Sequence, residues 1–544
     1  MGRVNFNPVI DAKKNGTPFF DPDGRIWFVV FLITFGFLAA SLFHTINVPW
    51  VEEDNYYGAI YAQAAHNNLR AGLNVTGGVP VTLYFGPLPI PRQEYYVHHP
   101  TLLPLLVTGV VTLFGEREWA VKLIPIACSL LSLTFLWLLV RDTAGRRAAA
   151  LTAAFFATMP MELHYGDMVD FEPCLVMWML AALWSLRRWD TENKSRWAFF
   201  AGLCCFSAVW TDWPGYLFVS GISLTYLFKK ESPKRGFALA LLGLAGVSGI
   251  LFLFQIRNVN PEAWSDLWTA VTLRLGNGVG TGSAAVAHAA TAHFTIREWL
   301  RSIFHALGED YLVSSWIFVL AGMIYLGSRI KSSPGLRWIG WATLQMAIAG
   351  IPYMLLLRNW SYIHDFASFF AIGSIAILGG LGIEGMLDWI ERNGGSRISQ
   401  PALSLTAVAL LIWLGAAGFI RAENQRSQFC ILDGAPGEPS NLVPDLGSQL
   451  GRIFSQDTTI LCNFDPYGST LPYYAQRTII NNISSADEWK STAKELLVPA
   501  GGVIWTGSPS AAEILEALPK EEISRITVDE IDFAVWKPGQ TRQK

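Results

Sequence analysis

Val51-Glu52-Glu53-Asp54-Asn55-Tyr56-Tyr57-Gly58 is the stretch that decides the fold, because its three consecutive carboxylates follow the first long apolar run of the chain. That run, 26–46, is about as long as the roughly 20 apolar residues that a helix needs to cross a bilayer. The acidic triplet therefore lies at or just beyond a membrane surface, where adjacent charges are costly unless they are used. A solvated loop and a functional site both fit this stretch alone.

The composition is typical of a polytopic membrane protein. Of 544 residues, 51% are apolar and 15% are charged, and the mean hydropathy is +0.32; soluble domains carry about 25% charged residues. The 22 Trp and 33 Phe suit lipid-facing helices and aromatic belts. The net charge of −3 argues against a nucleic-acid partner, which would call for a basic face. The polar first 25 residues and the long first apolar run do not fit a cleavable signal peptide.

Apolar runs predict about 11 membrane-spanning helices. They cover 26–46, 118–140, 148–163, 171–186, 197–211, 214–228, 236–256, 313–327, 337–357, 366–387 and 401–420. The apolar stretch 102–114 is too short to cross a bilayer, and we expect it to lie on the surface or to re-enter. The predicted architecture is an α-helical polytopic domain over 26–420, after a cytoplasmic segment 1–25.

The distribution of positive charge orients these helices. If 102–114 does not cross, the segments on one side (1–25, 141–147, 187–196, 229–235, 328–337 and 388–400) carry 20 Lys and Arg residues. The short loops on the other side carry only Arg358. Lys and Arg are retained in the cytoplasm, so we expect the N-terminus inside and the acidic triplet outside. Two long loops, 47–117 and 257–312, are then outer loops, and long loops tend to be functional.

The last part of the chain, 421–544, reads as a small soluble α/β domain on the outer side. Strands are predicted at 458–463, 478–482, 502–506 and 526–536, separated by helices near 442–454, 485–497 and 509–518. Cys430 and Cys462 are the two cysteines of this part. Because the outer compartment permits oxidation, they are candidates for a disulfide.

Titratable residues gather on the predicted outer face. All nine histidines map to outer loops or to the outer end of a helix, which suggests that polar work is done there. Acidic residues occupy the outer helix ends at Asp167, Asp170, Glu172, Asp212 and Asp365. Each could be a solvated helix cap or a functional group at the membrane boundary.

Two outer constellations could bind a phosphate. His98 and His99 precede Pro100, which can begin a helix, and a helix N-terminus attracts anions. The second is the basic and aromatic loop from Arg358 to Asp365. Arg358 is a candidate phosphate clamp, although an arginine that snorkels at a helix end would look the same in sequence.

These segments together resemble the glycosyltransferases of the GT-C fold. The nearest groups are the protein O-mannosyltransferases and the aminoarabinose (lipid A) transferases, with a bacterial family-39-like branch of largely undefined acceptors. The residues that carry the resemblance are Glu53-Asp54-Asn55-Tyr56-Tyr57-Gly58, His99-Pro100-Thr101-Leu102, Phe114-Gly115-Glu116-Arg117-Glu118-Trp119-Ala120, Arg141-Asp142-Thr143-Ala144-Gly145-Arg146-Arg147 and Asp167-Met168-Val169-Asp170-Phe171-Glu172-Pro173. It covers about 26–260 well and the later helices by layout.

The resemblance implies transfer of a sugar from a polyprenyl-phosphate donor to an acceptor hydroxyl on the outer face, usually with inversion. Glu53 stands where the family has its catalytic Asp, and Asp54 where it has Glu, so the usual order is swapped; we favour Glu53 as the base. The second acidic site, for the acceptor, falls on Glu172, with Asp170 and Asp167 nearby.

The resemblance also implies a phosphate site, a set of partners and a location. The donor-phosphate candidates are His98, His99, Arg358, Tyr362 and His364, with Arg274 or Arg257 as further sources of charge. No cofactor is certain, although the clustered outer carboxylates and histidines could bind a divalent cation. The partners would be the polyprenyl-phosphate sugar donor, membrane lipids, and a lipid, glycan or protein acceptor. The location would be the bacterial inner membrane, as part of the cell-envelope machinery.

Two other classes compete with the enzyme. A transporter or flippase of a lipid-linked sugar would place ionisable residues at mid-membrane on broken helices, whereas this chain keeps its charges at the outer ends. A non-catalytic scaffold that presents the soluble tail would tolerate changes at Glu53.

Overall fold

The structure is a computed structural model that describes residues 22–50, 56–228, 234–275, 294–393, 400–426, 441–464 and 469–539. The acidic segment 51–55, with Glu53 and Asp54, lies outside these residues. Cys430 does too, so its pairing with Cys462 stays a prediction.

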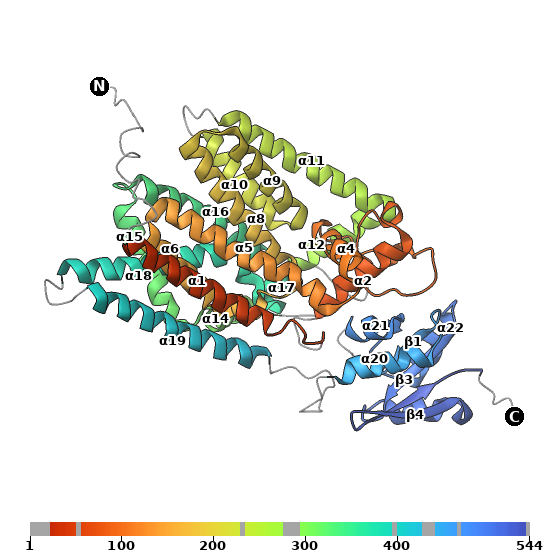
Figure 1. The fold of residues 1–544 in the computed structure, drawn as a ribbon. Coiled ribbons are helices and arrows are strands. Elements are labelled where there is room, and N and C mark those ends of the chain that lie inside the picture. Colours follow the sequence, from red (N-terminus) through yellow and green to blue (C-terminus); the bar gives the residue numbers. More distant parts are fainter. Residues whose placement is uncertain are drawn as a thin grey trace.

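The described residues before 427 form an almost wholly helical domain (Figure 1). Its helices are α1 (Pro22–Phe43), α2 (Tyr56–Ala71), α3 (Leu73–Thr76), η2 (Arg92–Glu94), α4 (Leu102–Phe114), α5 (Glu118–Ala144), α6 (Arg146–Ala157), α7 (Pro160–Tyr165), α8 (Phe171–Glu192), α9 (Ser195–Thr211), α10 (Pro214–Phe228), α11 (Arg235–Val259), α12 (Ala263–Arg274), α14 (Ile296–Tyr311), η3 (Val313–Ser315), α15 (Trp316–Arg329), α16 (Pro334–Leu356), α17 (Arg358–Ile363), η4 (Asp365–Ala371), α18 (Ile372–Asn393) and α19 (Gln400–Arg426).

Six of the described helical segments are long and apolar enough to cross a membrane. They are Arg25–Phe43, Glu118–Ala144, Arg235–Val259, Pro334–Leu356, Asp365–Asn393 and Leu405–Arg426. A seventh is counted if α14 and the segment Val313–Arg329, which are bent by 84°, form one span. The prediction of a polytopic membrane protein is confirmed, whereas the number of 11 spans stays a prediction. The predicted short segment 102–114 is the helix α4, with the same bounds.

The core of the bundle is built around α18, which packs against α6 and α15. A Cβ atom at Gly382 would lie 1.9 Å from the backbone oxygen of Phe318, and one at Gly380 would lie 2.3 Å from Thr152 Oγ1. Small residues let helix backbones approach closely, as in other membrane bundles. The glycines of α18 therefore fix the contacts that hold the bundle together.

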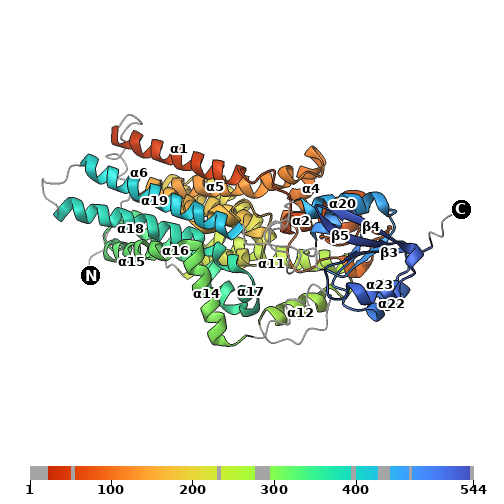
Figure 2. The ribbon, with the colours of Figure 1, turned by 90° about the horizontal axis from the view of Figure 1, so that it is seen from below.

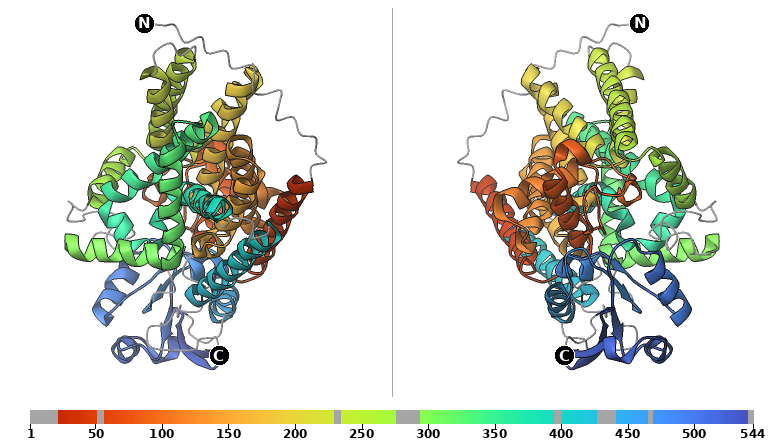
Figure 3. Two further views of the ribbon diagram at one scale, coloured as in Figure 1. Left: turned by 90° about the vertical axis from the view of Figure 1, so that its left-hand side faces the viewer. Right: turned by 90° about the vertical axis from the view of Figure 1, so that its right-hand side faces the viewer.

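The two long loops predicted to lie outside contribute helices at one end of the bundle. The first of them, 47–117, contains α2, α3 and α4, and Asn68 Nδ2 of α2 donates a hydrogen bond of 3.0 Å to Thr108 Oγ1 of α4. Figures 1 and 2 show α2, α4 and the C-terminal domain together at this end. In both views of Figure 3 the C-terminal domain lies below the helices as a separate layer.

The C-terminal domain is a five-stranded sheet with short helices. Its elements are α20 (Leu442–Ile453), β1 (Thr459–Cys462), α21 (Thr470–Ala475), β2 (Ile479–Ile480), α22 (Ala486–Glu495), β3 (Ala500–Trp505), α23 (Ala511–Ala517), η6 (Lys520–Glu522), β4 (Ile523–Val528) and β5 (Ile531–Trp536). The strand order is β2-β1-β3-β5-β4; β1 is parallel to β2 and β3, and β5 is antiparallel to β3 and β4. The predicted α/β domain is confirmed as a small sheet.

One strand of this prediction is wrong. The expected single strand 526–536 is the end of β4, a two-residue turn and β5. The turn residues Asp529 and Glu530 both have positive φ, 48° and 67°, as a tight hairpin turn with the right twist requires. Because neither residue is Gly or Asn, the sequence lacks the usual hairpin signal.

Gly58 of the opening stretch is required for the packing of Trp50. A Cβ atom at Gly58 would lie 2.2 Å from Trp50 Cζ3, and Trp50 is fully buried. We expect Gly58→Ala to lower the free energy of unfolding by about 1–3 kcal/mol, as overpacked cores do. Thermal unfolding of the detergent-solubilised protein measures this. Gly109→Ala is the control, since a Cβ atom there meets nothing within 4 Å; equal effects at both positions would contradict the packing argument.

Candidate functional site

Polar and titratable side chains from seven segments meet at the end of the bundle that carries α2 and α4. We call this set the polar cluster; its members are Tyr57, Tyr61, Tyr96, His98, His99, Asp170, Glu172, Asp212, Arg274, Tyr353 and His364. Five residues predicted for the donor or acceptor site are among them: His98, His99, His364, Asp170 and Glu172. Residues separated by up to 307 positions are thus brought into one site.

The positively charged half of the cluster is centred on Arg274, the last residue of α12. Its Nη1 donates a hydrogen bond of 3.3 Å to His364 Nε2. The opposite ring nitrogen, His364 Nδ1, lies 3.3 Å from Tyr57 Oη. If Nε2 accepts from Arg274, a neutral imidazole carries its proton on Nδ1 and donates it to the phenol. Within the described residues His364 is the one hydrogen-bond partner of Arg274, which leaves the other N–H groups of the guanidinium for a ligand.

His99 is oriented by an aspartate. Its Nδ1 lies 2.7 Å from Asp212 Oδ1, in the turn between α9 and α10, and Asp212 is almost fully buried. The imidazole also stacks on Phe171, with ring centroids 4.6 Å apart. A carboxylate on one ring nitrogen fixes the ring and directs the other nitrogen to a ligand. His99 therefore meets the geometric requirement for a phosphate donor.

His98 and His364 are neutral partners of this charge. Burial, with the nearby His99 and Arg274, lowers the pKa of His98 from 6.5 to about 3. Burial, with Arg274 and His99, also lowers the pKa of His364 well below its ordinary range. Both imidazoles could therefore form hydrogen bonds to a phosphate, but they would carry no charge. The permanent positive charge of the cluster comes from Arg274.

The lowered pKa values of these two histidines predict that the protein is less stable in acid. Below about pH 6.5 the unfolded chain binds protons that folded His98 does not accept until about pH 3, so stability falls as the pH is lowered through this window. We expect the unfolding temperature to drop between pH 6.5 and 4, and His98→Gln to flatten that drop. Thermal unfolding against pH measures it, with His44→Gln at an exposed histidine as control. Identical slopes for wild type and both variants would refute the assignment.

The acidic half of the cluster lies at the start of α8. Asp170 caps the helix, because its Oδ1 accepts the Phe171 backbone N–H at 2.9 Å, and Tyr61 Oη donates to the same oxygen at 3.4 Å. Glu172 is in the first turn and is 2% exposed. A helix N-terminus stabilises both carboxylates. Burial raises the pKa of Tyr57 and Tyr61, and both carboxylates raise it further, so these phenols stay protonated donors.

The remaining residues predicted for the site are not part of the polar cluster. Asp167 accepts a hydrogen bond of 2.5 Å from Thr45 Oγ1 and pairs with Arg426 of α19 at 3.5 Å, so it ties helices together. Tyr362 stacks on Phe294 with ring centroids 4.4 Å apart. No interaction between Arg358 and the polar cluster is seen in the described part of the chain, and Arg257 is exposed.

Asp212 and Trp213, which were not among the predicted site residues, hold the two histidines in place. Asp212 was recognised as an outer acid, but nothing local linked it to His99, 113 positions away. Trp213 Nε1 donates a hydrogen bond of 2.8 Å to the backbone oxygen of His98. The signal available in the sequence was that Asp212 is the single charged residue in a two-residue outer loop.

Within the described residues, no group of three or more His, Cys, Asp or Glu side chains is placed to hold a metal ion. Glu53 and Asp54 lie outside those residues. The expectation of a divalent cation therefore stays untested.

Known proteins support the predicted resemblance. Residues 98–256 match the family described as dolichyl-phosphate-mannose-protein mannosyltransferase. No curated protein matches the chain.

Among solved structures, the chain is similar to ArnT from Cupriavidus metallidurans bound to undecaprenyl phosphate. The TM-score is 0.59 at 14% identity, covering 94% of this chain and 97% of that one. It is also similar to the oligosaccharyltransferase AglB from Archaeoglobus fulgidus in complex with an inhibitory peptide and a dolichol-phosphate, with a TM-score of 0.54 at 14% identity over 88% of this chain and 69% of that one. A third is the arabinofuranosyltransferase AftD from Mycobacteria, with a TM-score of 0.51 at 12% identity over 94% and 40%.

At these identities the solved structures show the fold, which is GT-C. With the family match, the prediction of a membrane glycosyltransferase of this fold is confirmed.

Proposed function

We propose that this GT-C glycosyltransferase moves a sugar from a polyprenyl-phosphate donor to an acceptor hydroxyl on the outer face of the membrane, with inversion at the anomeric carbon. The observation that carries the proposal is the convergence of Arg274 and the Asp212–His99 pair on one cluster. A guanidinium and an oriented imidazole are suitable hydrogen-bond donors for the phosphate diester of the sugar donor and for the monoester that leaves. Two of the similar structures hold undecaprenyl phosphate and dolichol-phosphate, which agrees with this donor class.

The chemistry requires little from the protein beyond charge and one base. As the acceptor oxygen attacks the anomeric carbon, the bond from that carbon to the phosphate oxygen breaks, and negative charge grows on the polyprenyl phosphate. Arg274 and His99 would stabilise that charge where it develops. The acceptor hydroxyl loses its proton to a carboxylate.

Glu53 is the proposed base. Asp54 is three residues, and Glu53 four residues, before Tyr57 of the polar cluster. A chain extends by at most ~3.3–3.6 Å per residue, so both acids are within about 15 Å of the Tyr57 backbone. Asp170 and Glu172 are proposed to bind acceptor hydroxyls, since buried carboxylates at a helix start are strong acceptors.

The proposed orientation follows the charge distribution. α8 begins in the polar cluster and ends near Arg188 and Glu192, and α18 begins beside the cluster and ends at a cluster of ion pairs. Three arginines lie at that end of α18: Arg147 pairs with Glu384 at 2.8 Å, and Arg329 and Arg392 pair with Asp388 at 2.9 and 3.5 Å. The basic ends of the helices are thus opposite the polar cluster, which supports a cytoplasmic N-terminus and a polar cluster facing outward. We propose the bacterial inner membrane as the location.

Reconstitution tests the proposal. The purified full-length protein is placed in liposomes with a radiolabelled polyprenyl-phosphate sugar and with lipid, glycan or protein acceptors. Label transferred to an acceptor supports the enzyme. Donor that crosses the bilayer with no label transferred would favour the flippase class instead, and neither outcome with a range of donors would contradict both.

A further inference from the structure

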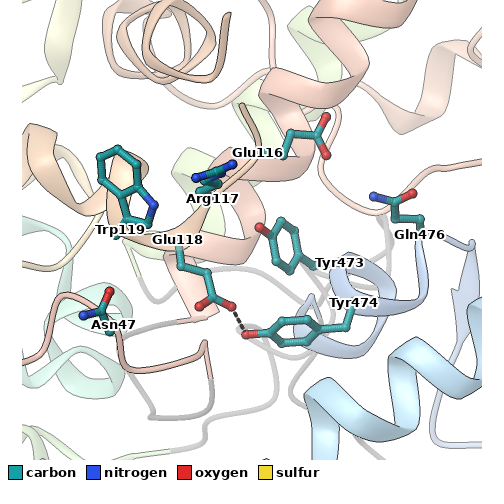
Figure 4. Close-up of a pocket in the computed structure, with 8 residues that line it drawn as sticks. All are labelled: Asn47, Glu116, Arg117, Glu118, Trp119, Tyr473, Tyr474 and Gln476. Atoms are coloured by element: carbon teal, nitrogen blue, oxygen red, sulfur yellow. Dashed lines mark hydrogen bonds between the residues drawn. The ribbon is translucent and has the colours of Figure 1, made fainter. Parts of the chain in front are cut away.

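A pocket of about 420 Å³ lies between the start of α5 and α21 (Figure 4). Residues 116–119 line one side of it, and Tyr473, Tyr474 and Gln476 line the other. Figure 4 shows Trp119 and Gln476 on opposite sides of the hydrogen bond that joins Glu118 to Tyr474. The volume is within the range of roughly 300–1,000 Å³ that is usual for small-molecule sites. The pocket is therefore large enough for a ligand that contacts both domains.

Hydrogen bonds within the protein fix two walls of this pocket. Tyr474 Oη donates to Glu118 Oε1 and accepts the backbone N–H of Trp50 at 2.9 Å. Burial, and the nearby Glu118, raise the pKa of the Tyr474 phenol, so its proton stays in place. On the same side as Glu118, Glu116 Oε1 lies 2.6 Å from His66 Nδ1 of α2. Both walls are therefore preformed, as in most ligand sites.

A third side of the pocket is formed by Asn47, in the turn after α1. Lys122 of α5 is fully buried, and its Nζ donates to the backbone oxygens of Thr45 and Val48 at 2.8 and 3.1 Å. These two residues flank Asn47, so the buried ammonium fixes the backbone around it. The Asn47 side chain is exposed at the edge of the pocket.

The polar groups that line the pocket keep hydrogen-bonding capacity. Four of them have no hydrogen-bond partner among the described residues: the amides of Asn47 and Gln476, the guanidinium of Arg117 and the indole N–H of Trp119. In the same part of the chain, Glu116 and Glu118 each use Oε1 alone, which leaves Oε2 as an acceptor. The framework of the pocket is thus bonded, whereas its lining is available to a ligand.

This lining matches a saccharide. A sugar ring has C–H faces that pack on aromatic rings, and hydroxyl groups that both donate and accept hydrogen bonds. Trp119, Tyr473 and Tyr474 supply the aromatic surface. The carboxylates, the amides and Arg117 supply acceptors and donors for the hydroxyl groups. A phosphate fits less well, because two carboxylates outnumber the one guanidinium, and an apolar chain would leave the polar groups unpaired.

The pocket lies beyond the acidic half of the polar cluster. α5 and α8 run side by side in the same direction, because Cys128 Sγ lies 3.3 Å from Cys174 Sγ and, further along both helices, Trp184 Nε1 donates to Asp142 Oδ2 at 3.2 Å. α5 begins ten residues before Cys128, and α8 begins three residues before Cys174. At roughly 1.5 Å per residue, the start of α5 extends about 10 Å beyond the start of α8. An oligosaccharide can therefore occupy the pocket while its terminal unit reaches the cluster.

We propose that the pocket is an acceptor subsite that binds a saccharide, so that the acceptor of this enzyme is a glycan. The proposal rests on the proposed function, which leaves the class of the acceptor open. The pocket holds the units that lie away from the attacking hydroxyl, and Asp170 and Glu172 bind the reacting unit. No covalent bond changes in the pocket, so its residues contribute to acceptor affinity and not to the chemical step.

Binding of the full-length, detergent-solubilised protein to an array of oligosaccharides tests the proposal without a donor lipid. We expect one class of oligosaccharide to bind, and Trp119→Ala to weaken that binding about tenfold or more, because it removes the largest aromatic face. Gln476→Ala changes an exposed side chain and should weaken binding about threefold to tenfold, the effect of one hydrogen bond. The proposal is wrong if no oligosaccharide binds, or if both variants bind as wild type does.

Two variants outside the pocket are the matched controls. Gln456→Ala removes an exposed glutamine of the same domain, and Trp264→Ala removes a tryptophan that is 61% exposed on α12. Both should bind within about twofold of wild type, as surface changes away from a site do. Equal losses in the controls would overturn the assignment to the pocket. So would an array of peptides that bind in place of the oligosaccharides with the same dependence on Trp119.

Steady-state transfer to the oligosaccharide that binds separates this proposal from the proposed function. Gln476→Ala should raise the KM for the acceptor about threefold to tenfold and leave kcat and the donor KM unchanged, since lost binding away from the reacting atoms is uniform. An oligosaccharide that binds in the pocket but receives no sugar would contradict the proposed function alone. Transfer with an unchanged acceptor KM in both Trp119→Ala and Gln476→Ala would overturn the subsite and leave the proposed function intact.

Discussion

Replacing Glu53 by Gln is expected to lower kcat for sugar transfer about 10²–10⁴-fold, the usual range for loss of a general base. The amide has the same size as the carboxylate but cannot take up the proton of the hydroxyl group that receives the sugar. The donor KM should change little, because the phosphate is bound by Arg274 and His99. Transfer of radiolabelled sugar by purified protein measures both parameters.

The neighbouring acids supply the controls. Glu52→Gln removes the same charge one residue away and should leave kcat within a few-fold of wild type. Asp54→Asn tests whether Asp54, rather than Glu53, is the base. If Asp54→Asn abolishes transfer while Glu53→Gln does not, the base is Asp54, and equal activity of all three variants would contradict an acid–base role for this segment.

Arg274→Met should have the second large effect, about 10²–10³-fold on kcat/KM, the loss seen when one donor to a developing oxyanion is removed. The methionine fills similar space without charge. Arg274→Lys should be intermediate, because an ammonium keeps the charge but not the bidentate fork. The transfer assay measures the rates, and binding of the donor lipid separates KM from kcat.

Arg358→Met is the matched control for this prediction. Sequence reasoning favoured Arg358 as the clamp, whereas the described contacts link Arg274 with His364. We expect Arg358→Met to cost less than about tenfold. A large loss at Arg358 with none at Arg274 would mean that the phosphate binds at α17, near Arg358.

Much of the fold could be predicted because it follows from local patterns of apolar and polar residues. The long apolar runs, the short apolar stretch of α4 and the alternating strands of the C-terminal domain all depend on neighbours in sequence. Failures occurred where tertiary packing decides. The turn at Asp529 and Glu530 has positive φ without a glycine, and α21 is only six residues long, too short for a periodic signal.

The candidate site was predictable in residue type, but not in pairing. His99, Asp170, Glu172 and His364 were expected on the outer face, and they meet in one cluster. Their partners could not be foreseen: Asp212 is 113 positions from His99, and Arg274 is 90 positions from His364. Such pairs depend on how helices are arranged, which hydrophobic patterns do not specify.

The neutral state of His98 also depends on the fold. In sequence, two adjacent histidines before a proline suggest a cationic phosphate site. In the folded chain, burial and the neighbouring Arg274 remove the charge from His98, while the carboxylate of Asp212 holds His99.

A structure of the protein with polyprenyl phosphate bound tests the central claim most directly. The account predicts that the phosphate lies within hydrogen-bonding distance, about 2.7–3.2 Å, of the Arg274 guanidinium and of His99 Nε2, with the Glu53 carboxylate close to the acceptor hydroxyl. A phosphate bound beside Arg358, or anywhere that leaves Arg274 and His99 without contact to it, would contradict the account.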